Sequence, residues 1–222
     1  MPIRIAFVNG KGGVGKTTSA TLIAAALKDA GLHVAIEDRD PQLSATTAAS
    51  IFGLPLGDQA PFVIVDTAPS VHMPSTLDAI QTADLVVLVT TPSPLDLATT
   101  AATAKWIVAE RPHGQTRLLF NLVQTNNRFF DEMSEIANDI PFPRFSTYLI
   151  RRTSYQVAQL QGWKSIPANH RAEIVKLAME LANALPVREA DSRTVGQSDI
   201  AASAIVPSRT DALTTTESTS TL

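Results

Sequence analysis

The sequence feature that most limits the possible folds is a glycine-rich segment between a short apolar run and an alanine-rich stretch. Residues 10–18 read GKGGVGKTT and fit the pattern G-x-x-x-x-G-K-[ST]. The apolar run before them predicts a buried strand, and Thr17–Ala30 after them predicts a helix that ends before Gly31. A glycine-rich turn between a strand and a helix directs backbone N–H groups at a phosphate. We therefore expect a phosphate-binding loop directly after the first strand.

Each residue type in this loop has a separate physical role. The glycines allow the tight turn, and the start of the following helix adds its positive dipole end. Lys16 supplies a full charge to the β and γ phosphates, and the Thr17 hydroxyl suits a Mg²⁺ ligand. The predicted nucleotide-binding residues of the loop are Gly12, Gly13, Val14, Gly15, Lys16, Thr17 and Thr18.

Apolar runs alternate with helical stretches along the first part of the chain, which predicts an α/β fold. Near-continuous apolar runs suit strands that are covered on both faces. We expect a mostly parallel, twisted sheet flanked by helices on both faces. The predicted strands are Ile3–Asn9, Val34–Glu37, Phe62–Asp66, Leu85–Thr90 and Arg117–Leu122. Further predicted helices are Leu43–Phe52, Pro74–Thr82, Leu95–Glu110, Phe129–Asn138, Arg152–Leu160 and Ala168–Leu185.

Composition narrows the class of protein. The 222 residues include no Cys, which excludes a disulfide framework, a Cys-ligated zinc site and an iron–sulfur cluster. Aromatic residues make up only 5%, which argues against a base-stacking surface for single-stranded nucleic acid. The start, MPIRIAFVNG, does not resemble a signal peptide. We expect a cytoplasmic protein with one domain over residues 1–186 and a disordered, Ser/Thr-rich tail over 187–222.

Three motifs together resemble the ParA/MinD family of P-loop ATPases. KGGVGKTT at residues 11–18 resembles the family's deviant Walker A box. VAIEDRDPQ at 34–42 resembles its second box, and FVIVDTAP at 62–69 resembles its Walker B box. Weaker similarity continues through PSPLD at 92–96 and through 150–162, so the resemblance covers about residues 1–185. The interval between Asp40 and Asp66 is short for the family, which indicates a compact member. The glycine-rich loop starts at residue 10, so we expect a small form without an N-terminal DNA-binding domain.

The resemblance implies an ATPase that uses ATP and Mg²⁺ and forms a homodimer with ATP sandwiched between the copies. The implied catalytic residues are Lys11, Lys16 and Asp40. Lys11 would be the signature lysine that reaches the partner's phosphates, as an arginine finger does in trans. Asp40 would position the attacking water. The residues alone leave a second interpretation of Asp38 and Asp40 open, because Asp-Pro sequences favour turns.

The resemblance also implies a metal site and a base site. Thr17, Asp38 and Asp66 would surround the Mg²⁺ ion, with Asp66 acting through water. Asn121 lies at a position where the family uses an amide to bind adenine, and the loop 141–143 would line the base. Asparagine at the end of a strand is also common in ordinary loops, so this second interpretation of Asn121 stays open.

A basic segment lies near the end of the predicted domain. Residues 144–186 contain six basic and two acidic residues, whereas the whole chain has a net charge of −3. The resemblance implies that this segment binds nonspecific DNA, and the alternatives are a solvated helix face or ion pairs with acids of the N-terminal part of the chain. The predicted DNA-binding residues are Arg151, Arg152, Lys164 and Arg171.

The implied function is an ATP-dependent switch that associates with the nucleoid and partitions a plasmid or a chromosome. Family members of this type have a ParB-like or other adaptor that stimulates hydrolysis. One alternative is a scaffold ATPase that positions a protein organelle or a conjugation complex. Another is a MinD-like membrane switch, which requires a basic, bulky apolar helix at the C-terminus. The chain ends in TTTESTSTL, so we expect no membrane partner.

Overall fold

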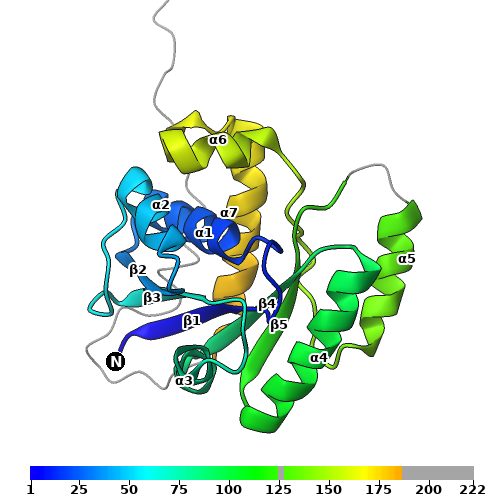
Figure 1. Cartoon of the computed structure of the whole chain (residues 1–222). Helices are drawn as coiled ribbons and strands as arrows, with labels where there is room; N and C mark the ends of the chain where they lie inside the picture. Colours follow the sequence, from blue (N-terminus) through cyan, green and yellow to red (C-terminus); the bar gives the residue numbers. More distant parts are fainter. Residues whose placement is uncertain (125–127, 187–222) are drawn as a thin grey trace, which may run out of the picture.

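Five parallel strands form a sheet in the order β2-β3-β1-β4-β5. The computed structural model describes residues 1–124 and 128–186 (Figure 1). This architecture confirms the predicted α/β class. The strands are β1 (Ile3–Val8), β2 (Val34–Arg39), β3 (Phe62–Thr67), β4 (Leu85–Thr90) and β5 (Gln115–Phe120).

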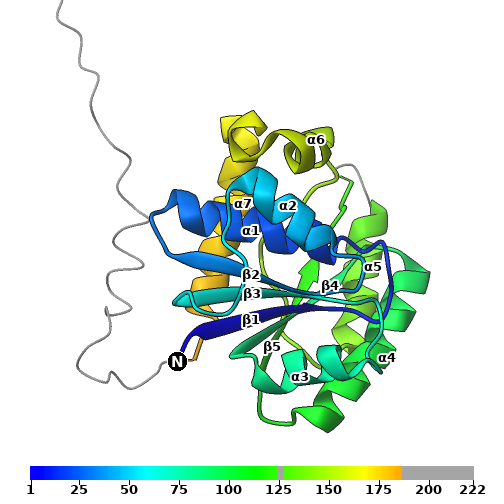
Figure 2. The same cartoon turned by 60° about the vertical axis from the view of Figure 1, so that its left-hand side comes forward.

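Helices cover both faces of the sheet (Figures 1 and 2). On the central strand, Ile5 and Phe7 belong to one buried cluster, and Ala6 and Val8 belong to another, because successive side chains point to opposite faces. The first cluster also contains buried side chains from α1 (Lys16–Asp29), α2 (Ser44–Phe52), α6 (Thr153–Gln161) and α7 (Ala168–Asn183). The second includes α3 (Pro74–Thr82), α4 (Pro94–Glu110) and α5 (Arg128–Ile136).

Some element boundaries differ from the prediction. β5 ends at Phe120, because Leu122 has a left-handed backbone with φ 57° and cannot continue the strand. β2 extends to Arg39, because backbone pairing with β3 does not depend on apolar side chains. Two short 3-10 turns, η1 (Ala137–Asp139) and η2 (Trp163–Ser165), follow helices. None of the helices among the described residues has the length and hydropathy to cross a membrane. The predicted tail, 187–222, lies outside the described residues.

Short segments cover both edges of the sheet. At the β2 edge, the Ile36 N–H donates to the carbonyl of Pro55, and the Gly57 N–H donates to the carbonyl of Ile36, each at 2.9 Å. At the β5 edge, the Leu118 N–H donates to the carbonyl of Pro143 at 2.9 Å, and the Leu118 carbonyl accepts from Phe145 at 3.0 Å. The central residues of both outer strands therefore have backbone partners on their outer side.

Candidate nucleotide site

The residues predicted to bind the phosphates, the metal and the attacking water lie near the carboxyl ends of the strands, which lie together in a parallel sheet. The glycine-rich loop joins β1 to α1, which begins at Lys16. The residue before it, Gly15, has φ 87°, and no side chain caps this end of the helix. The first N–H groups of α1 are therefore available to an anion, as the sequence predicts.

Asn121, which follows β5, contacts the glycine-rich loop through its side chain. Its side-chain amide donates to the carbonyl of Val14 at 2.8 Å, and the residue is only 3% exposed. A side-chain carbon at Gly15 would lie 2.0 Å from Nδ2 of Asn121, so a larger residue would displace the Asn121 amide, and the φ angle also favours glycine. The structure thus brings Asn121 to the phosphate loop and gives it a contact that the sequence did not indicate.

Lys16 lies within the site and is almost completely buried. Its Nζ donates to the carbonyl of Lys11 at 3.1 Å. Burial lowers the pKa of the Lys16 ammonium, and the nearby carboxylates of Asp66 and Asp40 act in the opposite direction. The Lys16 ammonium, which would bind a phosphate, therefore lies near the carboxylates of Asp66 and Asp40.

Asp66, at the end of β3, is fully buried beside the loop. The Thr17 hydroxyl donates to Oδ2 of Asp66 at 2.6 Å, and Oδ1 has no hydrogen-bond partner among the described residues. Burial raises the pKa of Asp66 to about 7, and the negative charges of Asp38 and Asp40 add to the rise. An unpaired carboxylate oxygen next to a hydroxyl is the donor set that suits Mg²⁺ with its water shell. These residues therefore fit the predicted metal.

Asp38 and Asp40 shape the turn after β2. Asp38 faces Asp66 in the strand ladder, and its Oδ2 accepts hydrogen bonds from the N–H and the hydroxyl of Thr46 in α2, at 2.7 and 3.0 Å. Asp40 is 9% exposed, and its Oδ1 accepts from the N–H of Gln42 at 3.0 Å. Both carboxylates therefore make the local turn contacts of the alternative interpretation, while they also lie near the phosphate loop.

Lys11 pairs with a residue for which the sequence indicated no role. Its Nζ forms an ion pair with Oδ1 of Asp96, in the first turn of α4. Asp96 belongs to the PSPLD segment at 92–96. Similarity to the family therefore pointed to this segment, but it did not predict the ion pair with Lys11. The pairing joins residues 85 positions apart and becomes visible only when the fold is known.

A cavity of about 310 Å³ opens beside the phosphate loop. Its wall combines the loop with the segments that follow β4 and β5 and the segment that precedes α6. Arg151, predicted to bind DNA, is one of its lining residues, and no described residue forms an ion pair with it. The lining residues are Gly13, Thr91, Pro92, Ser93, Asp96, Leu122, Gln124 and Arg151.

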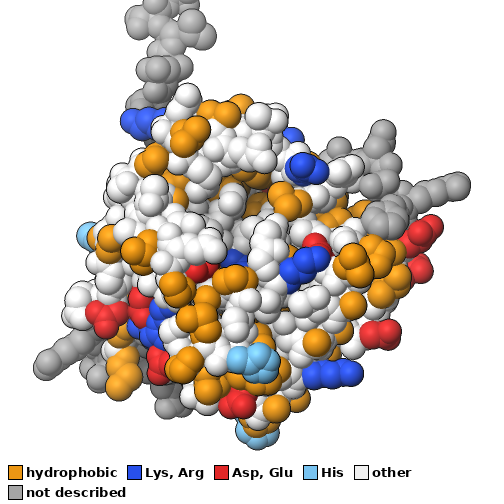
Figure 3. All heavy atoms as spheres, in the orientation of Figure 1, with side chains coloured by type: hydrophobic (Ala, Val, Ile, Leu, Met, Phe, Trp, Pro, Cys, Tyr) orange, Lys and Arg blue, Asp and Glu red, His pale blue; other side chains and the backbone are white. Residues whose placement is uncertain are grey.

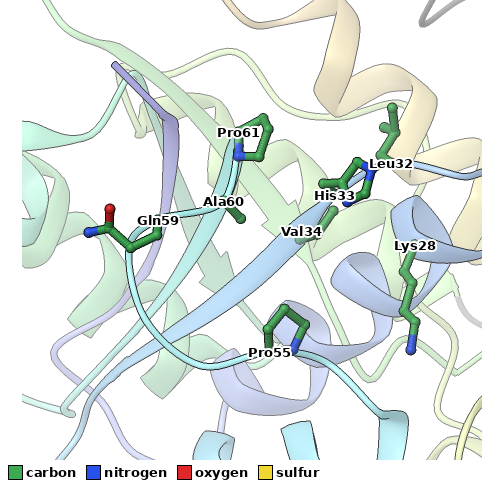
Figure 4. A pocket seen from close by; sticks show the side chains of 8 residues that line it. All are labelled: Lys28, Leu32, His33, Val34, Pro55, Gln59, Ala60 and Pro61. Atoms are coloured by element: carbon green, nitrogen blue, oxygen red, sulfur yellow. The ribbon is translucent and has the colours of Figure 1, made fainter.

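A second cavity, of about 330 Å³, lies toward the amino ends of the strands (Figure 4). Its lining includes Val34 at the amino end of β2 and Pro61 directly before β3, whereas the phosphate loop follows the carboxyl end of β1. Lys28 in its wall donates to the carbonyls of Phe52 and Gly53, at 3.3 and 2.6 Å. This cavity is therefore separate from the candidate nucleotide site.

The other predicted DNA-binding residues lie between the residue that precedes α6 and the first half of α7. Arg152 forms an ion pair with Glu173 at 2.9 Å, and Arg171 lies 5.9 Å from the centre of the Trp163 ring. Lys164, on η2, is exposed. Figure 3 shows Lys and Arg side chains spread over the visible face and not gathered in one patch.

A family model agrees with this site. The model described as the CobQ/CobB/MinD/ParA nucleotide binding domain matches residues 5–164. That range contains the glycine-rich loop and all three aspartates of the site. A curated relative, "Maintenance of carboxysome distribution protein A" of Gloeobacter kilaueensis, is 33% identical over 183 residues, which cover 72% of this chain and 82% of the relative.

Solved structures share the fold. An ATP complex of a Cyanothece McdA variant has a TM-score of 0.66 at 12% identity and covers 85% of this chain and 99% of its own. The septum site-determining protein MinD of Pyrococcus horikoshii, complexed with Mg-ADP, has a TM-score of 0.63 at 17% identity. Its alignment covers 82% of this chain and 96% of that protein. At these identities the likeness concerns the fold alone.

Proposed function

The chain belongs to the CobQ/CobB/MinD/ParA family of nucleotide-binding domains, and on that basis we propose that it is a dimerising switch that positions a large protein assembly in the cell. It is an ATPase that uses ATP and Mg²⁺. The observation that carries the positioning proposal is the 33% identity to a relative whose name concerns carboxysome distribution. Plasmid or chromosome partition, the first choice from the sequence, has less support than the positioning alternative.

Each residue has a defined part in the proposed switch. The loop N–H groups and Lys16 bind the phosphates, and Thr17 and Asp66 hold the metal, which neutralises phosphate charge when it is bound. Asp38 holds the turn that carries Asp40, and Asp40 orients the attacking water. Lys11 contacts the nucleotide of the second copy. ATP thus stabilises the dimer, and hydrolysis removes that contribution.

The cargo can be tested in cells. Loss of the chain should scatter a fluorescently tagged protein assembly, while a tagged plasmid and a tagged chromosome origin keep their normal positions. Replacement by the Lys16→Ala variant should have the same effect, because it cannot hold the phosphates. Normal assembly positions together with lost plasmids would contradict the proposal and favour partition instead.

We also propose that nonspecific duplex DNA is the surface on which the switch works, with an adaptor protein that stimulates hydrolysis. Support comes from the basic excess of residues 144–186 and from the exposed Lys164. Arg171 lies beside Trp163, the sequence neighbour of Lys164. A dimer presents each cation twice, and such binding is strongly salt-dependent.

Retention on random duplex DNA and on anionic liposomes, each with ATP and with ADP, tests this surface. We expect ATP-dependent, salt-sensitive retention on DNA alone. Lys164→Glu should weaken it, whereas Lys105→Glu, the same charge change at an exposed residue of α4, should not. Retention on liposomes alone, or on neither, would overturn the proposal.

A further inference from the structure

We propose that Asp96 is a positioning residue for Lys11, which it holds against α4 in the single copy until the nucleotide of a second copy replaces it. This proposal rests on the proposed function, in which Lys11 reaches across the dimer. The competition between Asp96 and the partner's nucleotide would then set how readily two copies associate. No contact of Asp96 with nucleotide is required.

The contacts of Asp96 fix its carboxylate in one orientation. Oδ1 accepts a hydrogen bond from Nζ of Lys11, and Oδ2 accepts one from the Thr91 hydroxyl. Asp96 lies in the first turn of α4, where the helix dipole stabilises a negative charge. Its side chain is 13% exposed. The carboxylate is therefore a preformed receptor for one cation.

The backbone of Lys11 is tied to the same helix. Its N–H donates to Oδ1 of Asn9 at 2.9 Å, and Nδ2 of Asn9 donates to the hydroxyl of Thr100 at 2.9 Å. Asn9 and Thr100 are both fully buried. The backbone and the ammonium of Lys11 thus connect to α4 one turn apart, at Thr100 and Asp96. This double connection places the lysine before any second copy arrives.

The ion pair is strong enough to place Lys11 but weak enough to be exchanged. The Lys11 side chain is 37% exposed, and a partly exposed ion pair contributes modestly to stability. A triphosphate offers several charged oxygens in place of one carboxylate, so it can replace Asp96. The cavity lined by Gly13 and Asp96 leaves open space beside the pair.

The Asp96→Asn variant tests this competition. With a non-hydrolysable ATP analogue, it should dimerise at a protein concentration roughly 3- to 10-fold lower than the wild type, while ADP affinity of the single copy stays unchanged. Asp96→Glu should restore the wild-type threshold in part, and Thr91→Val should lower the threshold less. Asp131→Asn is the control, because Asp131 is also an acid in the first turn of a helix but is exposed.

Three results would overturn the proposal. One is an unchanged or higher threshold for Asp96→Asn, and another is an equal shift in the Asp131→Asn control. The third is a parallel loss of ADP affinity, which indicates a merely structural role. A Lys11→Ala variant measured alongside separates the two proposals. When one of these three results is obtained and Lys11→Ala stays a single copy, only the positioning role of Asp96 has failed. When Lys11→Ala dimerises like the wild type, the proposed ATP-sandwich dimer itself has failed.

Discussion

The buried charge of Asp66 costs stability, although the proposed metal site needs that charge. Its carboxylate is fully buried, with one hydrogen bond from Thr17 and one oxygen without a partner among the described residues. Without a metal, only the Thr17 hydrogen bond and the nearby charge of Lys16 offset the burial of the charged form. A neutral side chain of the same shape should suit the metal-free fold better, even though it cannot serve the ATPase.

We predict that Asp66→Asn stabilises the metal-free protein at pH 8 and abolishes Mg²⁺-dependent ATP hydrolysis. The folded pKa of about 7 exceeds the ordinary value of 3.8, so the folded form retains a proton that the unfolded form has lost. Wild-type stability therefore falls as pH rises from about 4 to 7, by as much as roughly 4 kcal/mol. Urea unfolding with EDTA at pH 5 and pH 8 measures the change.

The exposed Asp58→Asn variant is the control for that experiment. It should show the same pH dependence as the wild type, since it retains Asp66. An Asp66→Asn variant that is less stable than the wild type at pH 8 would contradict the assignment of a costly buried charge.

Asn121 has two candidate roles, which are to bind adenine and to support the phosphate loop. A comparison of ATP with GTP separates these roles. We predict that Asn121→Ala lowers the affinity for ATP and for GTP by the same factor, about tenfold, because it removes a buried hydrogen bond that supports Val14. Nucleotide titrations measure both constants, with the exposed Asn138→Ala as control. A loss confined to ATP would show that the amide binds adenine.

At the scale of elements, α6 packs closely on α2. Gly162, which ends α6, has φ 79°, and a side-chain carbon there would lie 3.0 Å from the carbonyl oxygen of Ile51 in α2. The close approach involves backbone on one side, so it cannot be relieved by a rotamer change. The contact connects the C-terminal helices to the helix that follows Asp38 and Asp40.

We predict that Gly162→Ala destabilises the protein by about 2 kcal/mol or more, from backbone strain and from the clash with Ile51. Gly31→Ala is the matched control, because Gly31 has φ 88° with no atom within 4 Å of the added carbon. It should cost about 1 kcal/mol through backbone strain alone. Equal losses in thermal unfolding would contradict the close packing of α6 on α2.

Elements with a local signal were predictable, and contacts between distant segments were not. The apolar runs indicated all five strands, because a strand buried on both faces needs apolar side chains throughout. The end of β5 was missed, because Leu122 is apolar but has a left-handed backbone. Lys11–Asp96 and Arg152–Glu173 were also missed, because no periodicity marks a pair of charges far apart in the chain.

At the scale of the whole molecule, the proposed switch depends on how long the ATP-bound dimer lasts. We predict that Asp40→Ala slows turnover by about 100-fold and prolongs the dimer in proportion, because an unpositioned water attacks slowly. A chase with excess ADP, followed by size-exclusion chromatography with light scattering, measures the lifetime. Lys16→Ala, which should not dimerise, is the control. Fast dissociation of Asp40→Ala would place the hydrolytic role on another residue.

The covered sheet edges limit how copies of this chain can associate. An open edge strand is a template for the backbone of another molecule and a common starting point for aggregation. Here the segments around Leu56 and Arg144 already form bridges with the middles of β2 and β5. A folded copy thus resists extension into a continuous intermolecular sheet, even at high local concentration. The association proposed above therefore has to use other surfaces, and the proposed contact of Lys11 with the nucleotide of a second copy lies at the phosphate loop.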